Sequence, residues 1–314
     1  MKTKASVFLI CMLALATTGF QAAGRTIKGN GKVETRVINI SDYDEISLAG
    51  NVTFEYEQSD ASPFLSITVD ENIFEYIRAE VQQAKLSIGP RKENEYTGNS
   101  YNLNPTVFKV KSNSKNLKKV SKAGSGSFIV NSPLKIDNLN ISSAGSGNVR
   151  LTKNVTGNEL KISASGSGNL EISGPIKAER VVADLAGSGK VVLQEALSGN
   201  ELKVSLAGSG DIKAKEITVE KLHCSLAGSG GIQLLDGAIK EASYSIAGSG
   251  NIKAYECKAS TVKASLSGSG RLEIHASEAL NASTAGSGSI LYKGNPASVK
   301  ESKANRSGTI RSVQ

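Results

Sequence analysis

Several residue types are scarce in this chain of 314 residues. It has no tryptophan, seven phenylalanines, eight tyrosines, three cysteines and two histidines. A core with so little aromatic volume has to be filled by small and medium aliphatic side chains. Two histidines give little basis for a histidine-ligated metal site or a histidine-activated nucleophile. The low cysteine count neither requires nor excludes a disulfide.

A long hydrophobic run is missing as well. The apolar stretch Val7–Ala16 has about half of the roughly 20 residues that a membrane-crossing helix needs. Lys2 and Lys4 precede it, and small residues follow it up to Gly24. This order is typical of a secretory signal peptide. We therefore expect residues 1–23 to be a signal peptide and the mature chain, without a transmembrane segment, to be exported to the periplasm, the outer surface or the medium. A retained membrane anchor is the alternative.

The excess of positive charge is modest. The formal net charge of +8 becomes +6 without Lys2 and Lys4, and lysine alternates with glutamate along most of the chain. Such a dispersed excess is typical of a solvated surface, so nucleic acid is not expected as a partner. The positive balance leaves acidic glycans and anionic cell surfaces open, and a glycan or a surface protein is the kind of partner we expect.

Glycine is abundant, with 32 residues, and much of it belongs to a repeat. The triplet Gly-Ser-Gly begins at Gly124, Gly145, Gly166, Gly187, Gly208, Gly228, Gly248, Gly268 and Gly286. The successive spacings are 21, 21, 21, 21, 20, 20, 20 and 18 residues. A flexible linker would carry no regular aliphatic pattern around its glycines, so these triplets mark the units of a repeat protein.

Apolar and polar residues alternate after each triplet. The second residue after the triplet is aliphatic at Val149, Leu170, Val191, Ile212, Ile232, Ile252, Leu272 and Ile290. Period-two alternation predicts a strand with one buried face. A second such strand precedes each triplet, as in ELKISAS from Glu159.

Each unit is therefore predicted to be a strand, a polar turn, a second strand and a Gly-Ser-Gly corner. Because no unit contains a helical pattern, each strand has to pair with its counterpart in the next unit. The sequence predicts an all-β fold, a parallel β-helix in the form of a single-chain solenoid with about 20–21 residues per coil.

The triplet glycines are predicted to be structural corners. A sharp corner between two strands needs backbone angles that are open mainly to glycine, and stacked corners approach each other closely. The corner residues are Gly124, Gly126, Gly145, Gly147, Gly166, Gly168, Gly187, Gly189, Gly208, Gly210, Gly228, Gly230, Gly248, Gly250, Gly268, Gly270, Gly286 and Gly288.

Residues 24–122 lack the triplet and hold most of the aromatic residues that follow the expected signal peptide. The segment ISLAGNVTF, from Ile46, nevertheless matches the later units with Gly-Ser missing. A solenoid needs an atypical end to cover its first coil. We expect residues 24–122 to form irregular coils and a cap, continuous with a Gly-Ser-Gly β-helix over residues 123–314. A separate N-terminal domain is the alternative.

No catalytic constellation is evident. β-helical enzymes that cleave polysaccharides bring carboxylates together in a groove, whereas the acidic residues here fall at differing places in their units. Asp184 takes a position that is serine in other units; we interpret it as forming a corner hydrogen bond, and a catalytic role is the alternative. Cys224 and Cys257 lie in different parts of their units and should be free thiols. No catalytic residue, metal ligand or cofactor is therefore predicted.

The best candidate for a binding element is the polar stretch Gly89–Pro105, which carries Tyr96 and Tyr101. Long stretches without a regular pattern are often functional or simply mobile. Exposed tyrosines suit stacking on sugars or packing against proteins. Recognition through Tyr96 and Tyr101 and a mobile insertion are the two interpretations.

Three segments together carry a family resemblance: DYDEISLAGNVTFEYEQ from Asp42, NLKKVSKAGSGSF from Asn116, and the repeated (A/S)GSGxI units. The chain resembles the putative auto-transporter adhesin, head GIN domain family of bacterial exported proteins. This resemblance covers nearly all of the chain after the signal peptide. It implies a right-handed parallel β-helix at the cell envelope or outside it, and it carries over no catalytic residues.

We therefore expect an exported cell-envelope or surface β-helical protein with a binding or adhesin-like role, whose ligand the sequence does not identify. A β-helical carbohydrate-active enzyme, such as a polysaccharide lyase or hydrolase, and a purely structural spacer are the alternatives.

Overall fold

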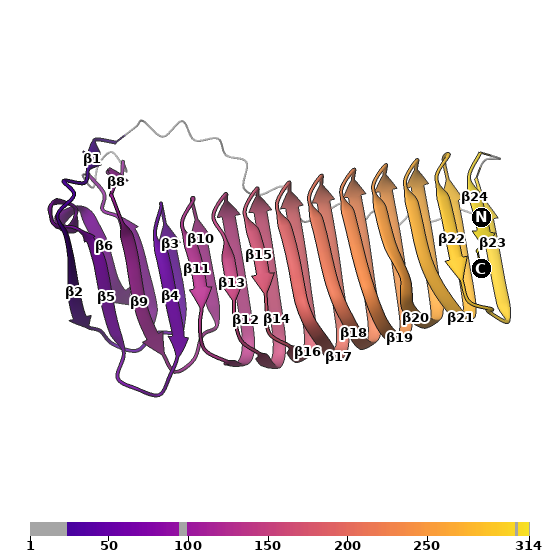
Figure 1. The fold of residues 1–314 in the computed structure, drawn as a ribbon, viewed down its shortest axis with the longest axis horizontal. Helices are drawn as coiled ribbons and strands as arrows, with labels where there is room; N and C mark the ends of the chain where they lie inside the picture. The colour runs from indigo at the N-terminus through magenta and orange to yellow at the C-terminus, as the bar shows by residue number, and fades with distance from the viewer. Residues whose placement is uncertain (1–23, 94–98, 305–306, 314) are drawn as a thin grey trace.

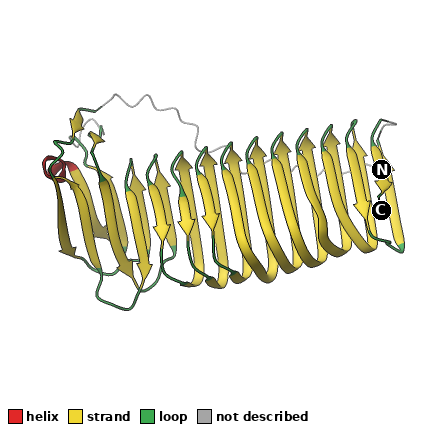
Figure 2. Cartoon of the chain, viewed as in Figure 1, coloured by secondary structure: helices red, strands yellow, loops and turns green. Residues whose placement is uncertain are grey.

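The computed structural model describes residues 24–93, 99–304 and 307–313, so the expected signal peptide lies outside the described residues. The described chain is a long rod of stacked β-coils with its N-terminal strands at one end (Figure 1). Apart from the short 3-10 helix η1 (Glu71–Tyr76), the described residues form strands and loops (Figure 2). No helix in these segments is long and apolar enough to cross a membrane.

The regular part of the rod is a parallel β-helix, as predicted. Its first coils consist of β10 (Lys119–Ala123), β11 (Ser127–Val130), β12 (Leu134–Gly145), β13 (Val149–Leu151), β14 (Val155–Gly166), β15 (Asn169–Ile172) and β16 (Ile176–Gly187). Each strand pairs in parallel with its counterpart one coil further on, for example β12 with β14 and β14 with β16.

Later coils differ from the predicted pair of strands with a polar turn between them. They are single long strands that bend around the rod: β17 (Lys190–Gly208), β18 (Asp211–Gly228), β19 (Gly231–Gly248) and β20 (Asn251–Gly268). The ladder between β17 and β18 continues across the bend with one register shift. Because neighbouring coils bend at the same place, their backbone groups stay paired there and no turn interrupts the strand. The rod ends with β21 (Arg271–Ala285), β22 (Ser289–Lys293), β23 (Ser298–Lys303) and β24 (Thr309–Ser312).

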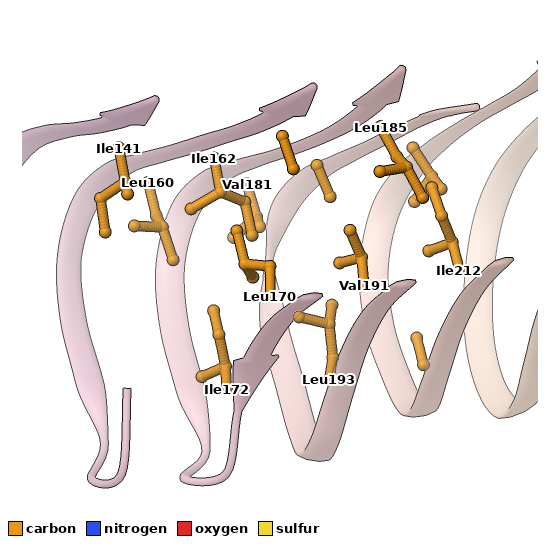
Figure 3. Close-up of a cluster of buried hydrophobic side chains, with 14 of the residues drawn as sticks. Ile141, Leu160, Ile162, Leu170, Ile172, Val181, Leu185, Val191, Leu193 and Ile212 are labelled. Carbon is orange, nitrogen blue, oxygen red and sulfur yellow. The ribbon is translucent and has the colours of Figure 1, made fainter. Parts of the chain in front are cut away.

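The interior of the rod is built from the predicted aliphatic columns. Val149 pairs with Leu170, which pairs with Val191 and so on to Ile290. Every member of this column is at most 1% exposed. Figure 3 shows the side chains of Leu170, Val191 and Ile212 inside the coils together with others from the opposite wall. Burial of one such side chain stabilises the fold by about 1.5–3 kcal/mol, so the stacked column is a main source of stability.

The N-terminal end is connected in an order that the sequence does not reveal. The coil made of β3 (Glu45–Ala49) and β4 (Thr53–Gln58) pairs on one side with β10 and β11. On its other side it pairs with β7 (Lys85–Pro90) and β9 (Phe108–Ser114). The segment between residues 58 and 119 therefore lies nearer the end of the rod than the coil of β3 and β4, although it follows that coil in the sequence. The chain then returns past this coil to β10, where the regular repeat begins.

A cap of antiparallel strands closes this end. β5 (Phe64–Asp70) pairs with β9 on one side and with β2 (Val33–Asn39) on the other, and β6 (Ile77–Gln82) pairs with β7. β1 (Thr26–Lys28) and β8 (Asn102–Asn104) form a separate two-stranded parallel sheet. We call residues 24–118 the head. Its β3, β4, β7 and β9 share the hydrogen-bonded sheet of the rod.

Asp70 is the polar anchor of the cap. The residue is fully buried, and its carboxylate accepts hydrogen bonds from the backbone N–H of Gly31 at 2.8 Å and of Thr106 at 2.7 Å. The Thr106 hydroxyl donates a further bond at 2.8 Å. Burial opposes ionisation of this carboxyl group, but the hydrogen bonds outweigh it and lower its pKa. Asp70 therefore ties three segments that are distant in sequence.

Candidate functional site

The Gly-Ser-Gly corners have a backbone geometry that explains their composition. The first glycine of every triplet has φ between 110° and 131°. At Gly208, an added Cβ would lie 2.5 Å from the carbonyl oxygen of Gly187 in the preceding coil. That same oxygen accepts hydrogen bonds from the backbone N–H of Ser209 at 3.1 Å and of Gly210 at 2.9 Å. Backbone hydrogen bonds thus hold successive corners so close together that the first glycine of the triplet has no room for a side chain.

A column of hydroxyl groups runs along the outer surface beside these corners. The paired residues are Ser121, Ser142, Ser163, Asp184, Ser205, Ser225, Ser245, Ser265 and Ser283. Asp184 is the one carboxylate in this set, paired with Ser163 and Ser205. The column gives the rod a repetitive surface of small side chains.

The head carries a small recess beside Tyr101. The Tyr101 ring is half-buried and meets the edge of Tyr76 with centroids 4.8 Å apart and planes at 67°. It lines a cavity of about 290 Å³ together with Pro90, Leu103 and Phe108, where the first corner of the rod begins. Tyr96, the other tyrosine selected from the sequence, lies outside the described residues.

A larger polar groove lies where the head meets the first regular coils. Its volume is about 730 Å³, and its lining includes Asp60, Lys115, Asp137 and Asn158. The amide of Asn158 donates to the Asp137 carboxylate at 2.5 Å. Asp60 and Lys115 come from loops of the head, whereas Asp137 in β12 and Asn158 in β14 occupy equivalent positions of successive coils, 21 residues apart. No repeat spacing relates the first pair to the second.

The Gln58 side chain fixes the wall of this polar groove. Its amide nitrogen donates to the backbone carbonyls of Lys115 at 2.8 Å and of Lys135 at 2.9 Å, while its oxygen accepts from the N–H of Lys135 at 2.7 Å. One side chain therefore joins three successive coils. The polar groove is preorganised by this bonding.

Comparison with known proteins identifies the family. Residues 42–191 and 179–296 match the family described as "Putative auto-transporter adhesin, head GIN domain". The chain belongs to this family. None of the curated proteins matches the chain.

Solved structures of proteins from Parabacteroides are similar to this head GIN domain protein over most of its length. One from Parabacteroides distasonis, described as a "Putative lipid binding protein", is 41% identical, covers 92% of this chain and 100% of its own, and has a TM-score of 0.54. A "putative adhesin" from Parabacteroides merdae is 33% identical, covers 93% and 100% respectively, and has a TM-score of 0.52. A "putative adhesin" from Parabacteroides distasonis is 29% identical, covers 92% and 100%, and has a TM-score of 0.54.

Two buried thiols and one buried phenol lie in the later coils of this head GIN domain protein, away from both recesses. Cys224 and Cys257 are buried free thiols, and burial raises the pKa of Cys257 to about 12 and that of Cys224 further. Tyr244 packs beside Cys224 in the same ladder and is 1% exposed. Burial raises the pKa of its phenol well above the ordinary value. Thiols held in their protonated form are poor nucleophiles, so this cluster has the properties of core packing.

Lys122 is a buried cation in the rod. It is 4% exposed and occupies an inward position equivalent to Leu48 and Ser143 in the adjacent coils. Its ammonium group donates to the carbonyl oxygen of Gly124 at 3.2 Å and lies 3.5 Å from the Ser143 hydroxyl. Burial lowers its pKa. Within the described residues, no group of three or more His, Cys, Asp or Glu side chains is placed to hold a metal ion.

Proposed function

We propose that this protein is exported to the cell envelope or surface and binds a ligand there through the head end of its rod. The observation that carries the proposal is the position of the polar groove and the Tyr101 recess. Both lie in the head or directly beside it, where the repetitive surface of the rod gives way to side chains of varied chemistry. A signal-peptide pattern at residues 1–23 and membership of an adhesin-like family support export.

The chemistry of the two recesses favours a polar, extended ligand. Carboxylate, ammonium and amide groups give the polar groove both hydrogen-bond donors and acceptors, as a glycan or an extended peptide requires. The Tyr101 recess adds an aromatic ring, two prolines and Phe108, which can pack against the apolar face of a sugar or a side chain. A volume of about 730 Å³ is within the usual range for a ligand site.

Polysaccharide hydrolysis is the second candidate, because Asp60 and Asp137 both line the polar groove. A glycosidase needs one carboxyl group kept protonated by an apolar environment and a second one ionised. Asp60 and Asp137 are both exposed, and Asp137 accepts hydrogen bonds from Asn138 and Asn158. This environment suits recognition better than acid catalysis, so we propose binding without turnover.

A combined binding and turnover experiment tests the proposal. The purified protein is applied to arrays of acidic and neutral glycans and of phospholipids, the latter because a relative is described as a putative lipid binding protein. Every ligand that binds is then incubated with the protein and examined for cleavage. Binding without cleavage supports the proposal, and cleavage of any polysaccharide contradicts it.

Matched variants locate the site. Asn158→Ala alters the polar groove, Tyr101→Ala alters the Tyr101 recess, and Lys213→Ala changes an exposed residue on β18 in the middle of the rod. We expect at least one of Asn158→Ala and Tyr101→Ala to weaken binding by about tenfold, the effect of losing roughly 1.4 kcal/mol of contact energy, while Lys213→Ala leaves it unchanged. Loss of binding in Lys213→Ala alone would place the site on the rod instead.

A further inference from the structure

The strand β2 at the N-terminal end of the rod has unusual exposure of apolar side chains. Among the described residues, the large hydrophobic side chains with substantial exposure are Val33, Val37, Ile38, Phe64 and Val299. The first three belong to β2 and Phe64 to its partner β5, whereas Val299 lies at the opposite end. Val37 is 67% exposed. By strand alternation, Val33, Val37 and Phe64 share one face of the sheet and Ile38 lies on the other. Exposed apolar side chains that gather in one place on a surface mark a contact site.

β2 also presents an open edge. Its described pairing is with β5 alone, and it forms the last strand of its wall at the left end of the rod in Figure 1. The carbonyl oxygen of Lys32 accepts a bond from the N–H of Glu71 at 2.8 Å, on the β5 side. Since backbone groups of successive residues point to opposite edges, Val33, Thr35 and Val37 direct their N–H and C=O groups away from β5. These groups are available to another strand.

The opposite end of the rod is protected against such pairing. The terminal strand β23 carries Lys300, Glu301 and Lys303, and β24 is only four residues long. Short strands and lysines are the usual devices that keep exposed edges from associating. β2 is seven residues long, contains no proline or glycine, and exposes valines instead. The contrast indicates that the β2 edge is used.

The sequence of β2 is complementary to itself in the antiparallel register that pairs all five residues Val33–Val37 with one another. The segment reads Val33-Glu34-Thr35-Arg36-Val37. If two copies pair with Thr35 opposite Thr35, then Glu34 of each copy faces Arg36 of the other, and Val33 faces Val37. Moving the symmetry centre to Glu34 or Arg36 would instead place like charges opposite each other, which destabilises a strand pair. A centre between residues would mismatch the open backbone groups.

We propose that two copies of this chain associate head to head through β2, in antiparallel register about a two-fold axis at Thr35. Strand pairing continues the sheet in the direction of the rod axis, so the dimer is a single rod of double length. Each Arg36 now contacts Glu34 within its own strand and lies 3.9 Å over the Phe74 ring. In the dimer, both charges remain paired across the new interface, and the valines on the other face cover one another.

Cysteine cross-linking tests the register directly. Residues opposite each other at the two-fold axis have Cα atoms about 5.5 Å apart, which a disulfide can bridge. Thr35→Cys should therefore form an intermolecular disulfide under mild oxidation. Val37→Cys is the matched control, because its two copies would lie four residues apart along the strands, about 14 Å. The native Cys224 and Cys257 are buried and should not interfere.

A charge-swap series measured by sedimentation velocity completes the test. The wild-type protein should show a concentration-dependent dimer. Glu34→Arg and Arg36→Glu should each weaken dimerisation by about tenfold or more, because the affected pair occurs twice in the dimer. The double variant Glu34→Arg/Arg36→Glu should restore it, which no merely structural effect of the single changes would do.

Three results would overturn the proposal. These are a wild-type protein that stays monomeric up to its solubility limit, a dimer that both single charge variants leave intact, and cross-linking of Val37→Cys as efficient as that of Thr35→Cys. Circular dichroism of every variant verifies that the rod is folded. Thr35→Cys removes one exposed hydrogen bond, between the Thr35 and Thr68 hydroxyls at 2.8 Å, and Val37 is exposed, so both substitutions should leave the monomer intact.

Discussion

Replacing Gly208 by alanine should strongly destabilise the rod, because two constraints meet at this residue. Its φ of 126° lies in the region that residues with a Cβ rarely adopt. The added methyl carbon would also lie 2.5 Å from the carbonyl oxygen of Gly187, well inside van der Waals contact. Since this oxygen accepts the hydrogen bonds of Ser209 and Gly210, the clash would displace the acceptor of both.

The magnitude follows from these contributions. Backbone strain of this kind costs about 1–3 kcal/mol, and each hydrogen bond that is lost costs about 0.5–1.5 kcal/mol. We expect Gly208→Ala to lower the free energy of unfolding by about 3 kcal/mol or more. Valine should be worse, because its two additional methyl groups also have to fit between stacked coils. The defect weakens the interfaces with both neighbouring coils.

Two other glycines separate the contributions. Gly31 has a φ of 80°, and no atom lies within 4 Å of the position that an added Cβ would take, so Gly31→Ala should show the backbone strain alone, about 1 kcal/mol. Gly231 has no positive φ, and the nearest neighbour of an added Cβ is the flexible carboxylate of Asp211 at 3.1 Å. Gly231→Ala should stay within about 0.5 kcal/mol of the wild type, and Ser209→Ala, at an exposed side chain, should do the same.

Urea unfolding followed by far-ultraviolet circular dichroism gives the midpoints of all four variants. The expected order of destabilisation is Gly208→Ala, then Gly31→Ala, then the other two. An unfolding midpoint of Gly208→Ala equal to that of Gly231→Ala would refute the close packing of the corners.

Three further predictions concern buried polar groups. Asp70→Asn should lower the free energy of unfolding by about 1–3 kcal/mol. Because folding lowers the Asp70 pKa, the stabilisation by Asp70 is complete above pH ~4 and disappears as the pH falls further. The urea midpoints of the wild type and Asp70→Asn should therefore converge in acid. Lys122→Met should stabilise the rod. Because burial lowers the Lys122 pKa, the stability difference between Lys122→Met and the wild type should shrink as the pH rises towards ~10.4, where the lysine of the unfolded chain also loses its proton. A stability difference that stays the same at high pH would contradict this. The thiols of Cys224 and Cys257 should stay unreactive towards an aromatic disulfide reagent at neutral pH until urea unfolds the protein, and rapid labelling of the native state would show that the core opens there.

The regular coils are predictable from the sequence because one local rule repeats in each of them. The alternation around Val149 or Ile212 fixes which side chains point inward, and the equal spacing of the triplets fixes which residues pair in the next coil. The same rule gives the inward position of Cys224 and the outward column that contains Asp184. Neither result requires knowledge of distant contacts.

The head is not predictable in the same way, because its pairing depends on contacts between distant segments. The motif at Ile46 identifies a coil of the solenoid, but its spacing does not show that β7 and β9 would cover the outer side of that coil. Likewise the polar groove combines Asp137 and Asn158, which are one repeat apart, with Gln58 and Lys115 of the head, and no spacing relates these two pairs. Tyr101 stands out in the sequence because aromatic residues are rare, although its packing against Tyr76 is a tertiary contact.

The enclosed position of the coil formed by β3 and β4 has a consequence for the order in which the chain folds. This coil gains its outer neighbour only when the chain has been delivered to β9, and its inner neighbour only after β10 and β11. Ordering the head therefore means closing long loops, which is entropically costly and slow. Each later coil needs only the next 20 or so residues, and it pairs with the exposed strands of a coil that is already folded. The head is therefore the slow nucleus of folding, and the rest of the rod grows from it coil by coil.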